Sequence, residues 1–133
     1  LAAEIALAIE DMHNQGIIFR NMSPESVLIE GDGHARLTGF SLSKRSSNSD
    51  RTLTQCGVED YLAPEIHQNQ GYGEYVDWWA FGVTLFEMVT GFRPFIAHEG
   101  QGDLLAEVII RNQPHWPPGV NMQALRTTQR GLG

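Results

Sequence analysis

A polar loop between two short apolar runs contains the residue types best suited to chemistry. The stretch IIFRNMSPESVLIE, residues 17–30, places this loop between the apolar runs IIF and VLI. A strand, a tight turn and a second strand would bring its polar side chains together, as in an active site. The carboxamide of Asn21, however, cannot act as a general base near neutral pH. The stretch therefore has the shape of an active site, and its chemistry depends on what the remaining polar residues supply.

The patterns next to this loop predict the elements that would position it. The stretch AAEIALAIEDMHNQG repeats Ile5, Ile9 and Met12 on one helical face, and Gly16 follows where a helix needs a left-handed terminating residue. Beyond the loop, the turn 31–33 predicts a hairpin that leads into a strand over 35–38. The loop is thus expected to be held between a helix and a hairpin.

The second half of the chain predicts further helices after a long irregular segment. Residues 39–60 show no periodicity, and within them SKRSSNSDRTLTQ is rich in Ser and Thr with charges of both signs, so we expect an exposed, mobile loop there. Pro64 then fits the first turn of a helix. The stretch DWWAFGVTLFEMVTG is apolar on nearly all sides and predicts a buried helix that begins near Asp77 and ends before Gly91. A last amphipathic helix is expected over Asp103–Arg111.

Composition excludes several classes of function. The chain has 133 residues and a net charge of −7, and its nine basic residues are scattered, which argues against a nucleic-acid partner. No apolar run is long enough to span a bilayer, so no membrane insertion is expected. The single Cys56 has no partner for an internal disulfide and suits a reducing compartment. The five histidines show no metal-binding spacing, and so we predict no metal site built from them.

Four motifs in register resemble the large lobe of a protein kinase. FRNMSPES stands where that family has the catalytic loop H/Y-R-D-L-K-P-E-N, and TGFSLSK stands where it has T-D-F-G-L-S-K. YLAPEI corresponds to the APE motif, and DWWAFGVTLFEMVTGFRPF corresponds to the D-x-W-S-x-G helix and the P-F beyond it. The CG before YLAPE, the GH before ARLTGF and the double Trp are most similar to the AGC group of Ser/Thr kinases.

The departures from the family pattern fall on the residues that carry its chemistry. Asn21 stands where the family has its catalytic Asp, and Ser23 replaces the Lys that contacts the transferring phosphoryl group. Ser26 and Gly39 replace the two magnesium ligands, and a glycine offers no side-chain ligand at all. Val58 replaces a Thr that contacts the Asp and the Lys in the family. The resemblance therefore implies a kinase fold without an intact catalytic residue, that is, a pseudokinase.

The structural positions of the family pattern stand unchanged. In the family, the counterpart of Asp77 holds the backbone of the catalytic loop, and the counterpart of Glu65 pairs with an Arg near the end of the lobe, for which Arg130 is a candidate here. The unchanged positions are Arg20, Pro24 and Glu25 of the loop, together with Phe40, Ala63, Pro64, Glu65, Asp77, Trp79 and Gly82. A gene in random decay would lose structural and chemical residues alike, whereas this chain has lost only the chemical ones.

The resemblance sets the expected architecture. We predict a mainly α, α+β fold: the C-terminal lobe of a kinase with short β-hairpins at the cleft edge. Residues 1–133 are read as one partial kinase domain that begins partway along a helix, with an activation segment over 39–65. The N-terminal lobe, with its glycine-rich loop and ATP-contacting Lys, is expected to be absent from this chain.

Two regulatory residues follow from the resemblance, with an alternative for each. Thr54 occupies the phosphorylation position of the AGC group, and phospho-Thr54 would pair with Arg20 and order the loop. Alternatively, Thr54 is a solvated loop residue and Arg20 caps nearby carbonyl groups.

Two acidic residues match positions that hold arginines of the substrate in basophilic AGC kinases. Glu25 and Glu87 therefore form a candidate docking site for a basic peptide. Alternatively, Glu25 belongs to the frame of the loop, and Glu87 is an ordinary residue near the end of a helix.

Three functions remain open at the level of sequence. The first is a pseudokinase that acts by binding or allostery, with protein partners that include basic peptides or other kinases. The second is a Ser/Thr kinase with residual or relocated catalysis, and the third is a truncated gene product without function. ATP and magnesium serve the family, but no cofactor is predicted for this chain. The expected location is the cytoplasm or the nucleus.

Overall fold

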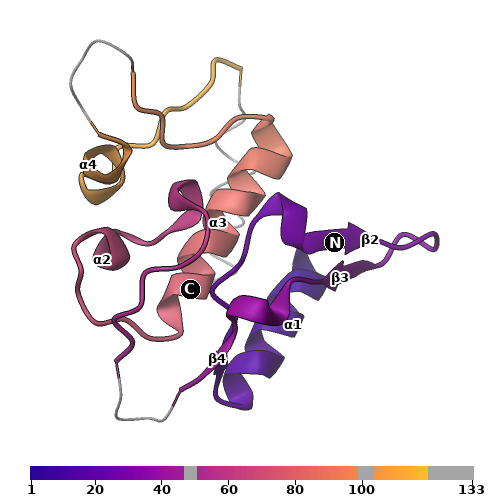
Figure 1. Cartoon of the computed structure of the whole chain (residues 1–133). Coiled ribbons are helices and arrows are strands. Elements are labelled where there is room, and N and C mark those ends of the chain that lie inside the picture. The colour runs from indigo at the N-terminus through magenta and orange to yellow at the C-terminus, as the bar shows by residue number, and fades with distance from the viewer. Residues whose placement is uncertain (47–50, 99–103, 120–133) are drawn as a thin grey trace.

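A computed structural model describes residues 1–46, 51–98 and 104–119 of the chain, and in these ranges it contains helices and two small antiparallel sheets (Figure 1). The helices are α1 (Ala2–Asn14), α2 (Pro64–His67), α3 (Tyr75–Thr90) and α4 (Leu105–Ile110). The strands are β1 (Ile17–Ile18), β2 (Val27–Ile29), β3 (Ala35–Leu37) and β4 (Lys44–Arg45). Single 3₁₀ turns lie at Pro24–Ser26, Phe40–Leu42 and Glu59–Tyr61. The mainly helical character predicted from the sequence is therefore confirmed.

Helix α1 buries the face that its apolar spacing predicts. Ile5 and Ile9 are 2% and 0% exposed, and Met12 lies one turn further along the same face. The helix ends at Asn14, and Gly16 follows with a φ of 70°, a left-handed conformation that glycine adopts without steric cost. The predicted terminating role of Gly16 is confirmed, and the chain turns there into β1.

The two sheets place the polar loop between helix α1 and the β2–β3 hairpin. Strands β2 and β3 form the predicted hairpin, with Val27 opposite Leu37 and Ile29 opposite Ala35. Strand β1 instead pairs with β4, with Ile17 opposite Arg45. The stretch 39–60, which shows no periodicity in the sequence, thus contains a strand, one complete 3₁₀ turn and the start of another. Each strand of the β1–β4 pair has only two residues, too few to produce a periodic pattern in the sequence.

Helix α3 forms the centre of the described structure. In Figure 1 it runs between α1 with the β2–β3 hairpin on one side and α2 with α4 on the other. It starts at Tyr75 and ends at Thr90, and Gly91 follows with a φ of 76°. Its buried residues are Val76, Asp77, Ala80, Phe81, Val83, Thr84 and Phe86. The predicted buried helix and its glycine terminus are therefore confirmed, although the last turn leaves Met88 and Val89 exposed.

The two short helices pack beside each other. Pro64 occupies the first turn of α2, as predicted, because its missing N–H has no acceptor to lose there. Helix α4 covers less than the predicted Asp103–Arg111, and Asp103 itself lies outside the described residues. Its Ile109 is fully buried in the main core, with Ile5, Phe19 and Phe81. None of the helices in the described ranges combines the length and apolar character needed to cross a bilayer.

Candidate functional site

A buried carboxylate fixes the backbone of the polar loop. Asp77, in the first turn of α3, is 1% exposed. Its Oδ2 accepts a hydrogen bond from the Phe19 backbone N–H, and its Oδ1 accepts one from the Arg20 backbone N–H, both at 2.8 Å. Arg20 has a φ of 62°, which is costly for a residue with a Cβ. The two bonds from Asp77 hold this conformation in place, and they set the position of the residues that follow.

A histidine on α1, which no motif in the sequence singles out, completes the anchor. His13 Nε2 lies 2.7 Å from Asp77 Oδ2, and its ring packs edge-on against Trp78 with centroids 5.7 Å apart. The pair is buried, with side chains 8% and 1% exposed. Helix α1, the polar loop and α3 therefore meet at one carboxylate. The available signal was the place of His13 beside the apolar face of α1.

Asn21 and Gly39, predicted as the vacated positions of a base and a metal ligand, lie in direct contact. The Asn21 Nδ2 donates a hydrogen bond to the Gly39 carbonyl oxygen at 2.8 Å. Gly39 has a φ of 81°, and a Cβ built on it would lie 2.6 Å from the Asn21 Nδ2. The Asn21 amide thus takes the space that any side chain at position 39 would need.

Ser23 and Ser26 are bonded to each other within one turn. The Ser26 Oγ donates to the Ser23 carbonyl oxygen at 2.8 Å and accepts from the Ser23 N–H at 3.1 Å. Both residues are buried, at 6% and 4% exposed. The Ser26 hydroxyl therefore serves the 3₁₀ turn Pro24–Ser26 and is not directed toward a ligand.

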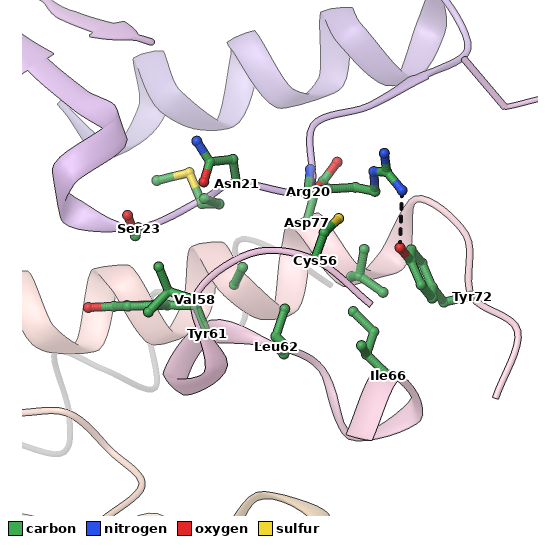
Figure 2. Close-up of a pocket in the computed structure, with 13 residues that line it drawn as sticks. Arg20, Asn21, Ser23, Cys56, Val58, Tyr61, Leu62, Ile66, Tyr72 and Asp77 are labelled. Carbon is green, nitrogen blue, oxygen red and sulfur yellow. Dashed lines mark hydrogen bonds between the residues drawn. The ribbon is translucent and has the colours of Figure 1, made fainter. Parts of the chain in front are cut away.

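Arg20 already has partners within the chain. Its Nε donates to the Leu42 carbonyl oxygen at 2.7 Å, and its Nη1 lies 3.4 Å from the Tyr72 hydroxyl (Figure 2). The Tyr72 hydroxyl in turn donates to the Thr54 carbonyl oxygen. The side chain of Thr54 is exposed. Arg20 thus caps a carbonyl, as one alternative from the sequence states, and phosphorylation of Thr54 stays a prediction.

A pocket lies between the polar loop and the segment 56–62, above the start of α3 (Figure 2). In Figure 2, Asn21 and Ser23 lie along one side of it and Val58, Tyr61 and Leu62 along the other. The residues that line it are Arg20, Asn21, Met22, Ser23, Cys56, Val58, Tyr61, Leu62, Ile66, Tyr72, Val76, Asp77 and Ala80. Its walls are mostly apolar, and among the described residues Asp77, which is bonded to the loop backbone and to His13, is the only carboxylate that lines it.

The two acids predicted to dock a basic peptide differ in their surroundings. Glu25 is exposed. Glu87 accepts a hydrogen bond from the Tyr61 hydroxyl, and its Oε1 lies 3.9 Å from Arg93 Nε. Burial and the bond to Glu87 raise the pKa of Tyr61 above its ordinary value, so the hydroxyl stays a donor at neutral pH. A basic peptide would share Glu87 with these two internal partners.

Three of the remaining predicted positions, Phe40, Ala63 and Trp79, serve packing. Phe40 packs edge-on against Phe19 at 5.3 Å, and Ala63 is fully buried. Trp79 stacks on Phe95 with centroids 5.6 Å apart, and its buried Nε1 has no hydrogen-bond partner among the described residues. Pro64 and Glu65 begin α2 and are half-buried, and Gly82 is exposed on α3. Arg130, the predicted partner of Glu65, lies outside the described residues.

Comparison with known proteins matches this chain to kinases over most of its length. A family model described as protein kinase domain matches residues 1–124. The chain is 51% identical over 131 residues to a cAMP-dependent protein kinase catalytic subunit of Dictyostelium discoideum, covering 98% of this chain and 20% of that protein. It is 49% identical over 94 residues to the human cAMP-dependent protein kinase catalytic subunit PRKX, covering 71% of this chain and 26% of that protein.

A third similar protein is human ribosomal protein S6 kinase alpha-4, which is 42% identical over 135 residues, covering 97% of this chain and 17% of that protein. The chain thus spans 17–26% of the length of these curated relatives. All three are kinases of the AGC group, and the resemblance predicted from the sequence is confirmed.

Proposed function

The chain belongs to the protein kinase family, and we propose that it is large-lobe sequence of an AGC-like pseudokinase, which acts by binding other proteins rather than by transferring phosphate. The observation that carries this proposal is the contact between Asn21 and Gly39. A catalytic base and a metal ligand have to face a substrate and a magnesium ion from these two positions. Here the Asn21 amide instead bonds the Gly39 carbonyl oxygen and fills the space beside it.

The residues present do not fit magnesium and ATP in the way the family uses them. Magnesium prefers carboxylate oxygens at near-octahedral geometry. Gly39 has no side chain, and the hydroxyl of Ser26 is used inside its own turn. Ser23 adds no positive charge where phosphoryl transfer accumulates negative charge. These residues therefore do not support phosphoryl transfer by the mechanism of the family.

The assignment to the large lobe rests on the order of the elements. A helix, a polar loop, a hairpin, a segment ending at the Ala63–Pro64–Glu65 triplet and a central apolar helix follow one another in the order in which the resemblance places them. The 133 residues contain no glycine-rich G-x-G-x-x-G motif, which covers the phosphates of ATP in kinases. The proposal therefore concerns the large lobe alone.

A Ser/Thr kinase with residual catalysis is the second candidate function. The identity of 51% to a protein named as a cAMP-dependent kinase catalytic subunit favours it. The two candidates differ in what magnesium and ATP do to the protein.

Binding of magnesium–ATP separates the two candidates. Thermal unfolding of the longest form that the gene encodes is measured with and without millimolar Mg²⁺–ATP. A ligand that binds only the folded state raises the melting temperature, because it stabilises by RT ln(1 + [L]/Kd). The pseudokinase proposal predicts no magnesium-dependent rise. A rise that needs both Mg²⁺ and ATP would contradict it and favour the kinase.

A basic peptide is the partner for which the loop offers a candidate contact. Glu25 is exposed on the turn of the polar loop, and Glu87 carries charge near the end of α3. Binding of an arginine-rich peptide, measured by fluorescence anisotropy, is expected to weaken about tenfold in the double variant Glu25→Ala with Glu87→Ala, because charge-assisted hydrogen bonds to arginine are lost. The matched control is Glu10→Ala with Asp11→Ala on the exposed side of α1. Affinity that survives the first double change would refute this docking site.

A further inference from the structure

Two segments far apart in the sequence are paired beside the polar loop. Thr52 and Tyr72 form an isolated antiparallel bridge, in which each backbone N–H donates to the other residue's carbonyl oxygen at 3.0 Å. Both residues are buried, at 2% and 3% exposed. Next to them, Arg51 Nη1 donates to the Gly71 carbonyl oxygen at 3.2 Å. Segment 51–54 is thus attached to 71–72 through its backbone.

The backbones approach each other closely because residue 71 is a glycine. A Cβ built on Gly71 would lie 2.8 Å from the Cβ of Arg51. Real Cβ atoms do not come this close, and so a larger residue at position 71 would separate the two segments. The pairing is therefore specific to the residues on both sides.

One hydroxyl group extends this pairing to the polar loop. The Tyr72 hydroxyl lies within hydrogen-bond distance of Arg20 Nη1, at 3.4 Å, and donates to the Thr54 carbonyl oxygen (Figure 2). The Tyr72 ring is held in an apolar cluster with Ile18, Leu62, Ala63, Ile66 and Val76. Its position is thus set by packing that involves neither Arg20 nor Thr54.

Burial also keeps this hydroxyl protonated. Burial raises the pKa of Tyr72 above its ordinary value, and the nearby Arg20 guanidinium offsets only part of that effect. At neutral pH the group therefore remains able to donate to Thr54 while it accepts from Arg20.

We propose that Tyr72 is a positioning residue that holds segment 51–54 against Arg20 without any phosphate group. A phosphate on a loop orders it by joining the loop to an arginine through charge-assisted hydrogen bonds. Here a neutral hydroxyl joins the same arginine to the carbonyl oxygen of Thr54 itself. The segment is then ordered whether or not Thr54 is modified. The inference goes beyond the proposed function, since it holds for an active kinase as well as for a pseudokinase.

Hydrogen exchange of the backbone amides tests this role. The variant Tyr72→Phe keeps the ring in its cluster and removes only the hydroxyl. In the unphosphorylated protein we expect amides in segment 51–56 to exchange about three to ten times faster, the factor that the loss of one net hydrogen bond gives to a local opening equilibrium. The matched control is Tyr61→Phe, which removes a hydroxyl bonded to Glu87 and is expected to leave segment 51–56 unchanged. Unchanged exchange in Tyr72→Phe would overturn the proposal.

A second measurement needs no variant and so does not depend on how well one folds. The wild-type protein is compared before and after phosphatase treatment and after phosphorylation of Thr54 by an upstream kinase. Protection of segment 51–56 is expected to be equal in all three samples. Protection that appears only with phospho-Thr54 would overturn the proposal. Neither result depends on whether the protein binds ATP, so failure here is distinct from failure of the pseudokinase assignment.

Discussion

Asn21 and Gly39 lie in contact although 18 positions separate them in the chain. Each is a departure from the kinase pattern when the sequence is taken alone. The structure adds that the two departures accommodate each other, since the Asn21 amide occupies the space next to the Gly39 Cα. A substitution at Gly39 alone is therefore expected to have a different effect from the same substitution combined with a change at Asn21.

Replacing Gly39 tests this coupling. Gly39→Asp places a Cβ against the Asn21 amide and forces a side chain into a left-handed conformation, and we expect a loss of about 1–3 kcal/mol in the free energy of unfolding. In an Asn21→Ala background the steric part of that loss should disappear, leaving a coupling energy of about 1 kcal/mol between the two sites. Urea unfolding of the four proteins in the cycle measures it. Equal costs of Gly39→Asp in both backgrounds would contradict the coupling.

Residue types at the polar loop were predictable, and their partners were not. The sequence identified Asn21, Ser23, Ser26 and Gly39 because a motif fixes their register. It did not identify His13 or Tyr72, since nothing in the sequence links His13 to Asp77, 64 positions away, or Tyr72 to Arg20, 52 positions away. Contacts of this range depend on how the elements pack.

At the scale of elements, Asp77 joins the loop to α1 and α3. The apolar period of α1, its terminating Gly16 and the central apolar helix were all predictable, because each has a local pattern. Strand β4 was not predictable, because its two residues gain their structure only from β1. Beside the apolar core, long-range hydrogen bonds to the buried Asp77 carboxylate join these elements.

Removing the Asp77 carboxylate should weaken the attachment of the polar loop to α1 and α3 and lower the free energy of unfolding. Asp77→Ala leaves the Phe19 and Arg20 N–H groups without an acceptor in a buried place, and each such group costs about 1–3 kcal/mol. We expect a loss of about 2–5 kcal/mol in the free energy of unfolding, measured with urea. Asp11→Ala, which removes an exposed carboxylate of α1, is the matched control and should change it by less than about 0.5 kcal/mol. Equal stability of the two variants would rule out the anchoring role.

The β2–β3 hairpin is attached to α1 through an acid-sensitive contact. A hydrogen bond with His34, then one from the Ala35 N–H, lowers the pKa of Glu4 from 4.5 to about 2. A lowered pKa in the folded state means that the carboxylate form stabilises the attachment above pH 4.5. The stabilisation is lost as the pH falls from 4.5 toward 2.

An NMR titration tests the sign of this effect. The Glu4 carboxyl resonance should titrate with a midpoint near 2, and the Ala35 amide resonance should follow it. In Glu4→Gln the Ala35 amide should show no such transition. A Glu4 midpoint near the ordinary value of 4.5 would show that the contacts with His34 and Ala35 do not favour the carboxylate form of Glu4 over its protonated form.

For the molecule as a whole, we propose that kinase architecture is kept while kinase chemistry is lost. The residues that hold the loop, Asp77 and the apolar core of α3, are in place and bonded. Other residues stand at the positions where the family has its catalytic base, its phosphate-contacting lysine and its magnesium ligands. These residues form hydrogen bonds with one another. The family and the helical architecture could be predicted from the sequence, because motifs in register carry both. The mutual accommodation of the replaced residues could not, since it is a property of packing.

Transfer of phosphate from ATP distinguishes a pseudokinase from an active kinase. The longest form that the gene encodes is incubated with saturating Mg²⁺ and labelled ATP, with an arginine-rich Ser/Thr peptide as acceptor. Because Asn21, Ser23, Ser26 and Gly39 supply none of the groups that the family uses, we expect no transfer above the rate of a blank preparation. Transfer above that blank which disappears in the variant Asn21→Ala would refute the pseudokinase proposal and identify the protein as an active kinase.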